Sequence, residues 1–470
     1  MLKLTRRLFS LRPDAAYADF HERALFNHIL ASIDPTDGRT SYMVPVGRSE
    51  QQEYQDMQRD FTCCVGSGME SHALHGDGVW YESSDTVWLN LFVPSIARTT
   101  LGRAVLALET NFPDGDAATI RVTIPAPRTF TLKVRRPHWA GDDFQVQLNG
   151  TVLAQPALAA LSDPVAGGRA GGPGNEATAP VSTYVTITRT WRTGDTVTLR
   201  VPKALHLEPT PDDPSVTAIL WGPLALAGDM GPRITRTDEN AQTTPRLPAP
   251  VLVAATREVR DLVVSTETPG NFLVRGIARR SDDDAPAPDV SLTPFYRTHR
   301  RRYALYFDLQ TPDQYRDSLA AQRAAREASS RLDAMTVGTV IVGNPESEQA
   351  ANYRSDPADR AIARNEGRTQ RNGTGWFSYD LPVARDAAMS LVVTMFVEPG
   401  LPAPLGPFEI LVDGTSVGPY VPNHAASGFH RVTCDIPVGL TQGKGTVTVR
   451  FQANASGRIA PVYEVRSVKR

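Results

Sequence analysis

Apolar residues recur at helical spacing through the first part of the chain. Met1, Leu4 and Leu8 are three or four residues apart, which places them on one face of a helix and predicts that this face packs into a core. A second helix is predicted after the start signal Pro13-Asp14. Its apolar stripe consists of Tyr17, Phe20 and Ala24. We therefore predict a helical segment over residues 1 to about 75.

Beyond this segment the pattern changes to an alternation of apolar and polar residues, which is typical of strands with one buried face. The first set of predicted strands covers residues 79–81, 87–93, 120–124, 130–134, 144–148, 184–188 and 197–201. Among these strands, Asn149-Gly150 and Gly194-Asp195 have the chemistry of hairpin turns. The set predicts an antiparallel β-sandwich.

Composition marks two segments that interrupt the strand pattern. Residues 154–180 are rich in Gly, Pro and Ala and can bury little surface, so we expect a disordered surface insertion there. Residues 231–250 are rich in Pro, Thr and Arg and are expected to form a long loop or linker. Strand patterns resume at 260–264 and 303–307.

The predicted domain organisation follows from these patterns. A stretch rich in Ala, Arg, Gln and Glu predicts a connecting helix at 311–334. The last set of predicted strands covers residues 377–379, 391–397, 408–412 and 447–451. The fold class is therefore mostly β. It consists of a first region over 1–95 that begins with the helical segment, a β-sandwich region over 96–310, the connecting helix, and a second β-sandwich over 335–470.

Composition and charge exclude several classes of protein. A chain of 470 residues has room for about two to four domains. Its formal net charge of −2 gives no electrostatic reason to expect a nucleic acid partner, and no apolar run reaches the length that spans a bilayer. Arg6 and Arg7 interrupt the apolar start of the chain, so it is not interpreted as a signal peptide.

The candidate chemistry centres on Cys63 and Cys64, two of the three cysteines in the chain. Adjacent cysteines rarely form a disulfide with each other, but two neighbouring thiolates can share one soft metal ion. A buried cysteine is also a common core residue, so the residues alone leave a metal site, a nucleophile and a structural role open. Cys434 lies in a predicted strand and is expected to have no role.

The surrounding motifs resemble glycoside hydrolase family 127, the β-L-arabinofuranosidases. The motifs that carry the resemblance are Met1-Leu-Lys-Leu-Thr-Arg, Tyr42-Met-Val-Pro, Phe61-Thr-Cys-Cys-Val-Gly-Ser-Gly-Met-Glu-Ser-His-Ala, His75-Gly-Asp-Gly, Val87-Trp-Leu-Asn-Leu-Phe-Val-Pro-Ser, Arg135-Arg-Pro-His-Trp and Leu220-Trp-Gly-Pro-Leu. Glu346-Ser-Glu and Gly375-Trp-Phe-Ser-Tyr resemble the accessory β domain of many of these proteins. The match is strongest over residues 61–95 and weakest after Met335.

This resemblance implies the end of an (α/α)6 helical barrel followed by two β-sandwich domains. It implies that Cys63 is the nucleophile of a retaining hydrolase and that Cys63 and Cys64 both bind zinc. Zinc keeps a thiol deprotonated, and the thiolate is the form that attacks an anomeric carbon. Tyr42 aligns with a tyrosine that lines the substrate, and core packing is its alternative role. The implied substrates are β-L-arabinofuranosyl groups of plant glycans.

The sequence also departs from the family. Met1 aligns just after a Glu-x-Cys motif that supplies two further zinc ligands in the family, and the family's general acid/base lies upstream as well. We therefore expect this chain to be a C-terminal portion that is inactive alone, with zinc bound in the complete enzyme. Any export signal would belong to the upstream part, so localisation stays open. The alternative hypothesis is a non-catalytic β-sandwich protein that binds carbohydrate or supports a partner domain.

Other polar and aromatic residues have a possible role that a structure can test. Glu70 and His72 follow the cysteines on the same predicted helix and could ligate a metal, although polar residues satisfied within the barrel wall are the simpler interpretation. Trp376 and Tyr379 could form a sugar-stacking platform, although aromatic residues of strands usually lie in a core.

Overall fold

The computed structural model describes most of the chain. The described residues are 1–56, 58–59, 62–141, 143–153, 182–234, 248–357, 362–365, 367–397, 408–420, 428–454 and 457–470. The fold is mostly β, and it divides into two compact units, one ending at Leu319 and the other beginning at Ala320. None of the helices in these ranges is long and apolar enough to cross a membrane.

The first unit begins with helices. These are α1 (Leu2–Leu11), α2 (Ala15–Ala24), a π-helical turn η1 (Leu25–Ile29), a 3-10 turn η2 (Leu30–Ser32) and α3 (Cys63–Ala73). The predicted start signal is confirmed, because the side chain of Asp14 caps α2 by accepting a hydrogen bond from the backbone N–H of Ala16.

The prediction of helix between residues 33 and 62 is wrong. The described part of that stretch has only isolated bridges and the short strand β1 (Glu50–Gln51), since Pro35 and Pro45 interrupt helix formation.

The predicted helix at the start of the chain is confirmed as α1, but the prediction that its Met1, Leu4 and Leu8 face is buried is wrong. Met1 is 81% exposed and Leu4 is 51% exposed, whereas Phe9 is 1% exposed. The ring of Phe9 packs against Tyr81 and Tyr184 of the first sandwich, with ring centroids 4.3 and 6.4 Å away. The aromatic contact decides which side of α1 faces the protein. The outer side remains in solvent.

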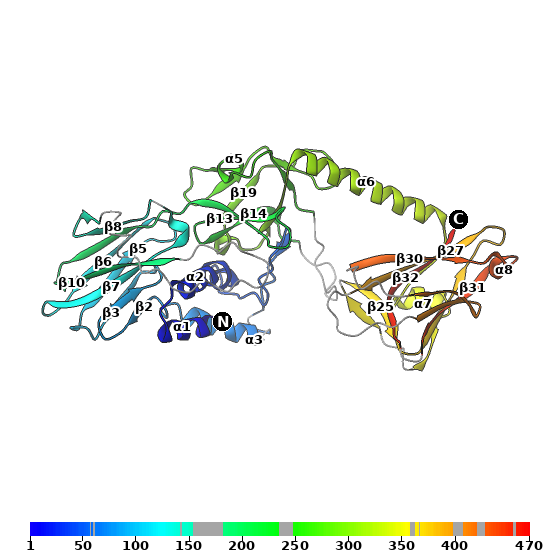
Figure 1. The fold of residues 1–470 in the computed structure, drawn as a ribbon, viewed down its shortest axis with the longest axis horizontal. Coiled ribbons are helices and arrows are strands. Elements are labelled where there is room, and N and C mark those ends of the chain that lie inside the picture. The colour runs from blue at the N-terminus through cyan, green and yellow to red at the C-terminus, as the bar shows by residue number, and fades with distance from the viewer. Residues whose placement is uncertain are drawn as a thin grey trace. The chain divides into compact units, whose positions relative to one another are not determined.

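The first β-sandwich follows α3 and consists of two sheets, with strand orders β10-β7-β3-β2 and β4-β5-β6-β11-β8-β9 (Figure 1). Its strands are β2 (Trp80–Glu82), β3 (Thr86–Leu89), β4 (Ser95–Arg98), β5 (Val105–Thr110), β6 (Ala117–Thr123), β7 (Arg128–Arg136), β8 (Gln145–Leu148), β9 (Thr151–Val152), β10 (Thr183–Trp191) and β11 (Thr196–Arg200). The sandwich begins at Trp80, so the predicted boundary after residue 95 falls inside it. One pair, β3 with β7, is parallel, so the sandwich is not wholly antiparallel as predicted.

One of the two predicted hairpin turns is confirmed. Asn149 and Gly150 have φ of 51° and 80° and join the paired strands β8 and β9, as a two-residue turn of mirror-image type requires. Gly194-Asp195 is not a hairpin turn, because β10 pairs with β7 while β11 pairs with β6 and β8. The turn connects strands that belong to different sheets. The N–H of Gly194 donates a hydrogen bond of 3.0 Å to the carbonyl of Val122, which stabilises the turn.

A third sheet, with 11 strands, completes the described part of the first unit, with the main order β16-β17-β19-β14-β13-β21-β15-β18. Its remaining elements are β12 (Leu205–Pro209), β13 (Val216–Trp221), β14 (Leu224–Pro232), β15 (Val251–Val253), α5 (Val259–Leu262), β16 (Val263–Ser265), β17 (Phe272–Val274), β18 (Ala278–Arg279), β19 (Val290–Pro294), β20 (Arg301–Ala304) and β21 (Tyr306–Gln310). The predicted linker at 231–250 therefore starts inside β14, and its residues 235–247 lie outside the described residues. The predicted insertion at 154–180 also lies outside them.

A buried charge cluster joins α2 to the first sandwich. Arg135 of β7 is fully buried and pairs with Glu22, and with Asp19 at 2.6 Å. Its Nε donates to the carbonyl of Asn90 at 2.7 Å. The indole N–H of Trp139 donates to Glu22 at 3.0 Å. The motif Arg135-Arg-Pro-His-Trp is thus explained by a structural role.

Replacement of Asp19 with asparagine is expected to lower the free energy of unfolding at neutral pH by about 2 kcal/mol. Burial by itself would raise the pKa of Asp19, but His138, Arg135 and Ser182 outweigh it and lower the pKa from 3.8 to about 2. A carboxyl group with a depressed pKa stabilises the fold above the unfolded pKa, and this contribution disappears as the pH falls to about 2. The difference in unfolding free energy between the two proteins should therefore shrink between pH 4 and pH 2 in urea titrations. A difference that stays constant between pH 4 and pH 2 would contradict this assignment to Asp19.

The long helix α6 runs from Pro312 to Met335, where the connecting helix was predicted. Its start is a capping box: the N–H of Gln314 donates to the hydroxyl of Thr311 at 3.3 Å, and the side chain of Gln314 accepts from the N–H of Thr311 at 2.9 Å. Tyr315 and Leu319 are the side chains that this helix buries, and they pack with Val251. The rest of the helix is largely exposed, which its polar composition favours.

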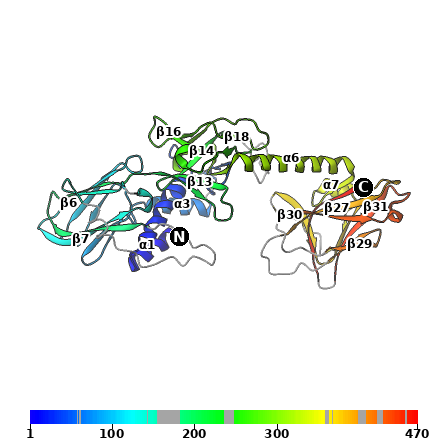
Figure 2. The same cartoon turned by 45° about the horizontal axis from the view of Figure 1, so that its top comes forward.

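The second unit is a β-sandwich, drawn in yellow to red in Figure 2. One sheet has the order β24-β25-β32-β27-β30 with β22 beside β32, and the other has the order β23-β26-β31-β28-β29. Its elements are β22 (Thr336–Ile341), α7 (Pro345–Ala350), β23 (Arg354–Ser355), β24 (Ala363–Asn365), β25 (Arg368–Gly373), β26 (Trp376–Pro382), β27 (Met389–Val397), β28 (Phe408–Val412), β29 (Thr415–Tyr420), β30 (Gly428–Ile436), α8 (Val438–Thr441), β31 (Thr446–Ala453) and β32 (Ile459–Lys469).

Two motifs of the second unit meet in its interior. Glu348 of α7 accepts hydrogen bonds from Arg371 at 2.6 and 2.7 Å, from the hydroxyl of Tyr379 at 2.9 Å and from the N–H of Gly343 at 2.8 Å. Tyr379 is fully buried, so it does not form a sugar platform. Trp376 is half-buried, with the guanidinium of Arg450 4.1 Å from its ring centroid.

Candidate active site

The two cysteines occupy the first turn of α3, and the loops before the helix position this turn. The side chain of Gln55 donates to the hydroxyl of Thr62, the N-cap residue, at 2.8 Å. The N–H of Gln55 donates to the carbonyl of Thr40 at 2.9 Å. The first turn of a helix presents free N–H groups and the positive end of the helix dipole, which favour a thiolate over a thiol. Cys63 and Cys64 are therefore in a suitable place for nucleophile or metal chemistry.

The structure brings together Cys63, Cys64 and Tyr42, the three residues to which the resemblance gave a role at the site. The sulfur atoms of Cys63 and Cys64 are 3.8 Å apart, and the hydroxyl oxygen of Tyr42 lies 3.9 Å from the sulfur of Cys63. Both thiols are free. Cys63 is exposed, Cys64 is half-buried, and Tyr42 is 47% exposed. A molecule in solvent can thus reach the sulfur of Cys63.

The 11-stranded sheet holds the loop that carries Tyr42. The hydroxyl of Tyr303 donates to the carbonyl of Pro45 at 2.7 Å, and the N–H of Leu305 donates to the carbonyl of Gly47 at 2.8 Å. Ser41 donates its hydroxyl to the carbonyl of Met43 within the same loop. The position of Tyr42 therefore depends on strands that lie about 260 residues further along the chain.

The sulfur of Cys63 affects the two groups next to it, the thiol of Cys64 and the phenol of Tyr42. Partial burial and the adjacent sulfur of Cys63 raise the pKa of the Cys64 thiol. The contact with Cys63 likewise raises the pKa of Tyr42. At neutral pH Cys64 is therefore a thiol and Tyr42 a phenol, and a bound cation would favour the thiolate of Cys64.

The spacing of the two sulfurs fits zinc. A tetrahedral zinc ion with Zn–S bonds of about 2.3 Å holds two sulfurs about 3.8 Å apart, which equals the observed separation. Within the described residues no group of three or more His, Cys, Asp and Glu side chains is arranged to hold a metal. Cys63 and Cys64 thus fit two positions of a zinc site and leave the others to donors elsewhere.

Glu70 and His72 do not complete this site. They lie about 10 Å or more along α3 from Cys63, because an α-helix rises about 1.5 Å per residue. Glu70 forms an ion pair with Lys3, and Nδ1 of His72 lies 3.1 Å from Nε2 of His75. The contact of Glu70 agrees with the simpler interpretation of a satisfied polar residue, whereas Nε2 of His72 is buried without a hydrogen-bond partner among the described residues.

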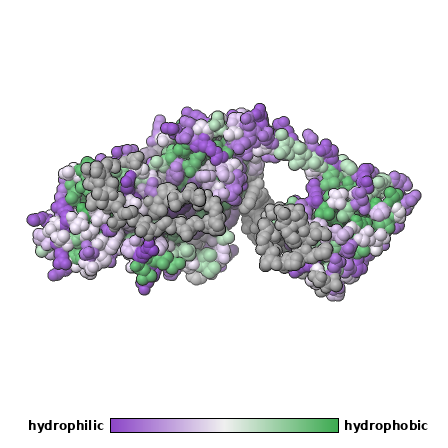
Figure 3. Space-filling view, viewed as in Figure 1, coloured by the Kyte–Doolittle hydropathy of each residue, from purple (hydrophilic) through white to green (hydrophobic). Residues whose placement is uncertain are grey.

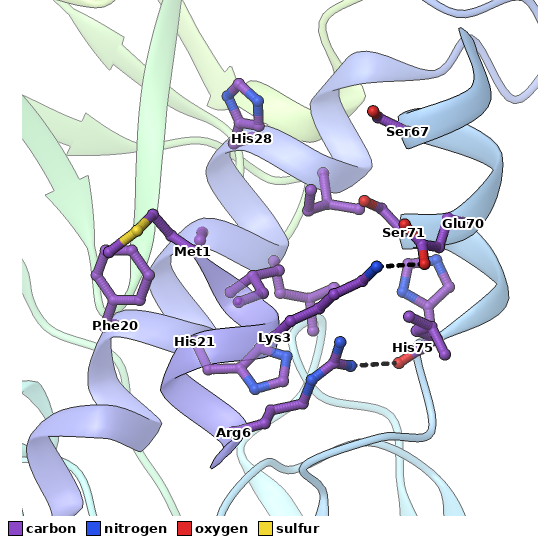
Figure 4. Close-up of a pocket in the computed structure, with 15 residues that line it drawn as sticks. Met1, Lys3, Arg6, Phe20, His21, His28, Ser67, Glu70, Ser71 and His75 are labelled. Atoms are coloured by element: carbon purple, nitrogen blue, oxygen red, sulfur yellow. Dashed lines mark hydrogen bonds and ion pairs between the residues drawn. The ribbon is translucent and has the colours of Figure 1, made fainter. Parts of the chain in front are cut away.

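Sequence reasoning missed a groove beside this site, between α1, α2 and α3 (Figure 4). Its volume is about 460 Å³, and Lys3, Arg6, His21 and His75 line it together with apolar side chains. Burial and the charges of Arg6 and Arg135 lower the pKa of His21 to about 4, so this imidazole is neutral at pH 7. The periodic pattern carried no signal for the groove, because only helix packing creates it.

Three parts of the chain match models of protein families. Residues 1–77 match the model for the β-L-arabinofuranosidase GH127 catalytic domain, and residues 86–203 match the model for the GH127 middle domain. The protein is therefore GH127-like, with the resemblance to a glycoside hydrolase that its sequence suggested. Residues 331–468 match a family of unknown function, DUF6805. The catalytic-domain match ends before Trp80, where the first sandwich begins, rather than at residue 95.

Solved structures similar to parts of this chain include the following three. A GH127 β-L-arabinofuranosidase from Geobacillus stearothermophilus T6 is 18% identical, covers 66% of this chain and 48% of its own, and has a TM-score of 0.47. A second GH127 β-arabinofuranosidase is 19% identical, covers 66% of this chain and 49% of its own, and has a TM-score of 0.46. A family 35 carbohydrate binding module from Clostridium thermocellum is 14% identical and covers 28% of this chain and 99% of its own, with a TM-score of 0.23. The chain spans about half the length of these GH127 structures. No curated protein matches it.

Proposed function

We propose that the chain supplies the Cys63–Cys64 centre of a retaining glycoside hydrolase that acts on β-L-arabinofuranosyl groups of plant-type glycans. The observation that carries the proposal is the pair of sulfurs 3.8 Å apart on the first turn of α3. The more exposed sulfur, that of Cys63, is assigned as the nucleophile. Cys64 is assigned as a zinc ligand together with Cys63.

In the proposed reaction, the sulfur of Cys63 attacks the anomeric carbon and the bond from that carbon to the glycosidic oxygen breaks. The departing oxygen takes up a proton, and water then displaces the sulfur from the same carbon. Two displacements retain the configuration of the sugar. Bound zinc would keep both sulfurs as thiolates at neutral pH. The phenol of Tyr42 is assigned to orient the sulfur of Cys63 and to line the substrate.

We further propose that the chain does not complete this reaction by itself. Two thiolates are fewer protein ligands than the three or four that zinc sites use. We assign no proton donor for the departing oxygen among the described residues. We therefore expect no release of 4-nitrophenol when the purified chain is incubated with 4-nitrophenyl β-L-arabinofuranoside. Release that survives in the Cys63→Ser variant would rule out Cys63 as the nucleophile.

Replacement of Cys63 or Cys64 with serine is expected to abolish metal binding. Co²⁺ titrated into the reduced chain should produce the thiolate-to-cobalt absorption band, and Zn²⁺ should displace it. Binding is expected to be weak because only two protein donors hold the ion. It should strengthen as the pH rises, since both thiols must lose protons.

Cys434→Ser is the matched control for this titration. Burial raises the pKa of the Cys434 thiol, and this residue lies in the second unit, so its replacement should leave the band unchanged. A band that persists in both Cys63→Ser and Cys64→Ser, or that disappears in Cys434→Ser, would contradict the assignment. A non-catalytic role in carbohydrate binding would then be the better hypothesis.

A further inference from the structure

One residue, Gln55, contacts both halves of the candidate site. Its backbone N–H donates to the carbonyl of Thr40 at 2.9 Å, which fixes Gln55 beside the loop that carries Tyr42. Its side-chain amide donates to the hydroxyl of Thr62 at 2.8 Å. Thr62 directly precedes Cys63 at the start of α3. Gln55 therefore links the loop of the phenol to the helix turn of the sulfurs.

Burial makes this link a specific one. Gln55 is 9% exposed, so its amide is largely out of solvent. A buried amide that loses its hydrogen-bond partner is destabilised by desolvation, which favours the orientation that bonds Thr62. The methyl group of Thr40 contacts the same helix, because it lies 3.5 Å from the position that a Cβ would have on Gly68. A polar contact and an apolar contact thus hold the loop against α3.

The hydroxyl of Thr62 is used for this link rather than for its helix. Thr62 is the N-cap residue of α3, but its side chain makes no capping hydrogen bond. A threonine at this position normally accepts a hydrogen bond from a backbone N–H of the first turn. Here the hydroxyl accepts from Gln55, and the N–H of Val65 bonds to the backbone carbonyl of Thr62 at 3.2 Å. The hydroxyl therefore contributes to the position of the turn and not to the capping of α3.

We propose that Gln55 is a positioning residue of the candidate site. Acting through Thr62, it fixes the first turn of α3 against the loop before it, so that the sulfur of Cys63 stays within 3.9 Å of the phenol oxygen of Tyr42. This proposal rests on the proposed function, since it concerns how the Cys63–Cys64 centre is held.

The first test measures alkylation of the reduced full chain by iodoacetamide at one fixed pH. Figure 1 places α3 at the lower edge of the first unit, and Figure 3 shows side chains at the surface along this edge, so a small reagent has access. Peptide mass spectrometry separates the initial rates of the two cysteines. Cys63 is exposed and Cys64 is half-buried, so Cys63 should react faster. The difference should shrink in Gln55→Ala and in Thr62→Val, because the turn is released.

The second test repeats the Co²⁺ titration on the same variants. The dissociation constant should rise about tenfold in Gln55→Ala and in Thr62→Val, as is typical when a group that orients a metal ligand is removed. Thr62→Ser keeps the hydroxyl and should retain both the affinity and the difference in alkylation. Thermal melting of Thr62→Val should match that of the unchanged chain, because the hydroxyl does not cap the helix.

Gln58→Ala is the matched control. It is the same replacement three residues further along the chain, at an exposed side chain, and should change neither readout. Unchanged alkylation in Gln55→Ala and Thr62→Val would overturn the proposal. Equal effects in Gln58→Ala, or a Thr62→Ser chain that behaves like Thr62→Val, would overturn it as well.

Failure of the proposed function gives a different result. In that case Co²⁺ produces no thiolate band in the unchanged chain, while the alkylation of Cys63 still responds to Gln55→Ala and Thr62→Val. This result would support the placement of Cys63 by Gln55 and would overturn the metal assignment. The two proposals can therefore fail separately.

Discussion

Replacement of Arg135 with methionine is expected to lower the free energy of unfolding of the first unit by about 3–5 kcal/mol. The guanidinium is fully buried, and it is the positive partner of Asp19 and Glu22. Methionine fills much of the volume of the arginine side chain, but it leaves both carboxylates without the guanidinium. The cost is therefore that of one buried acid, Glu22, and one half-buried acid, Asp19, without their counter-charge. The loss of the packing contact with Phe92, 5.7 Å from the guanidinium, adds little.

Arg136→Met is the matched control, since Arg136 is the next residue of the same strand and its side chain is half-buried rather than fully buried. Its replacement should change the unfolding free energy by about 1 kcal/mol or less. Urea unfolding followed by segment-resolved hydrogen exchange measures the effect on the first unit. Equal losses in the two variants would show that the buried cluster has no special role in joining α2 to the sandwich.

Replacement of Glu348 with leucine is expected to destabilise the second unit by about 3–5 kcal/mol. The substitution leaves the buried guanidinium of Arg371 without its carboxylate, and it removes the acceptor for the hydroxyl of Tyr379 and for the N–H of Gly343. Burial lowers the pKa of Arg371 and the carboxylate raises it. A guanidinium keeps its charge in proteins, so the arginine remains a buried cation when the carboxylate is removed. An unpaired buried charge is more costly than the loss of a hydrogen bond between neutral groups.

The control for this second replacement is Glu346→Leu, the same change of side chain two residues earlier on α7. Glu346 is exposed, so its replacement should change stability by about 0.5 kcal/mol or less. Hydrogen exchange of peptides from β25 and β26 reports the local effect. If the two glutamate variants lose protection to the same extent, the effect belongs to helix α7 as a whole rather than to the pair with Arg371.

Most of the β architecture followed from alternation along the chain, because each strand of a sandwich has one buried face. The Asn149-Gly150 hairpin was predictable for a local reason, since both residues tolerate positive φ. Gly194-Asp195 has a similar composition but crosses between sheets, because the pairing partners of β10 and β11 lie elsewhere in the sequence. Turn chemistry specifies a reversal of the chain and does not specify which strands pair.

The candidate site was predictable in part. Adjacent cysteines drew attention to Cys63 and Cys64 because two neighbouring thiolates can share one metal ion. Their 3.8 Å separation and the approach of Tyr42 depend on the conformation of the loops before α3. Those loops are held by Tyr303 and Leu305, which no local pattern connects to Tyr42. The groove between α1, α2 and α3 was not predictable for the same reason.

The sequence by itself determined the local preferences of this protein: the helical and strand periods, the capping of α2 and α6, the Asn-Gly turn and the presence of two neighbouring thiols. These properties depend on residues within a few positions of one another. Only the tertiary structure decided that Phe9 rather than Leu4 faces the protein, that Tyr42 reaches Cys63, and that Arg135 meets Asp19 and Glu22. These outcomes depend on contacts between residues distant in sequence, where burial, charge and packing of the whole unit select among faces that local patterns leave equivalent.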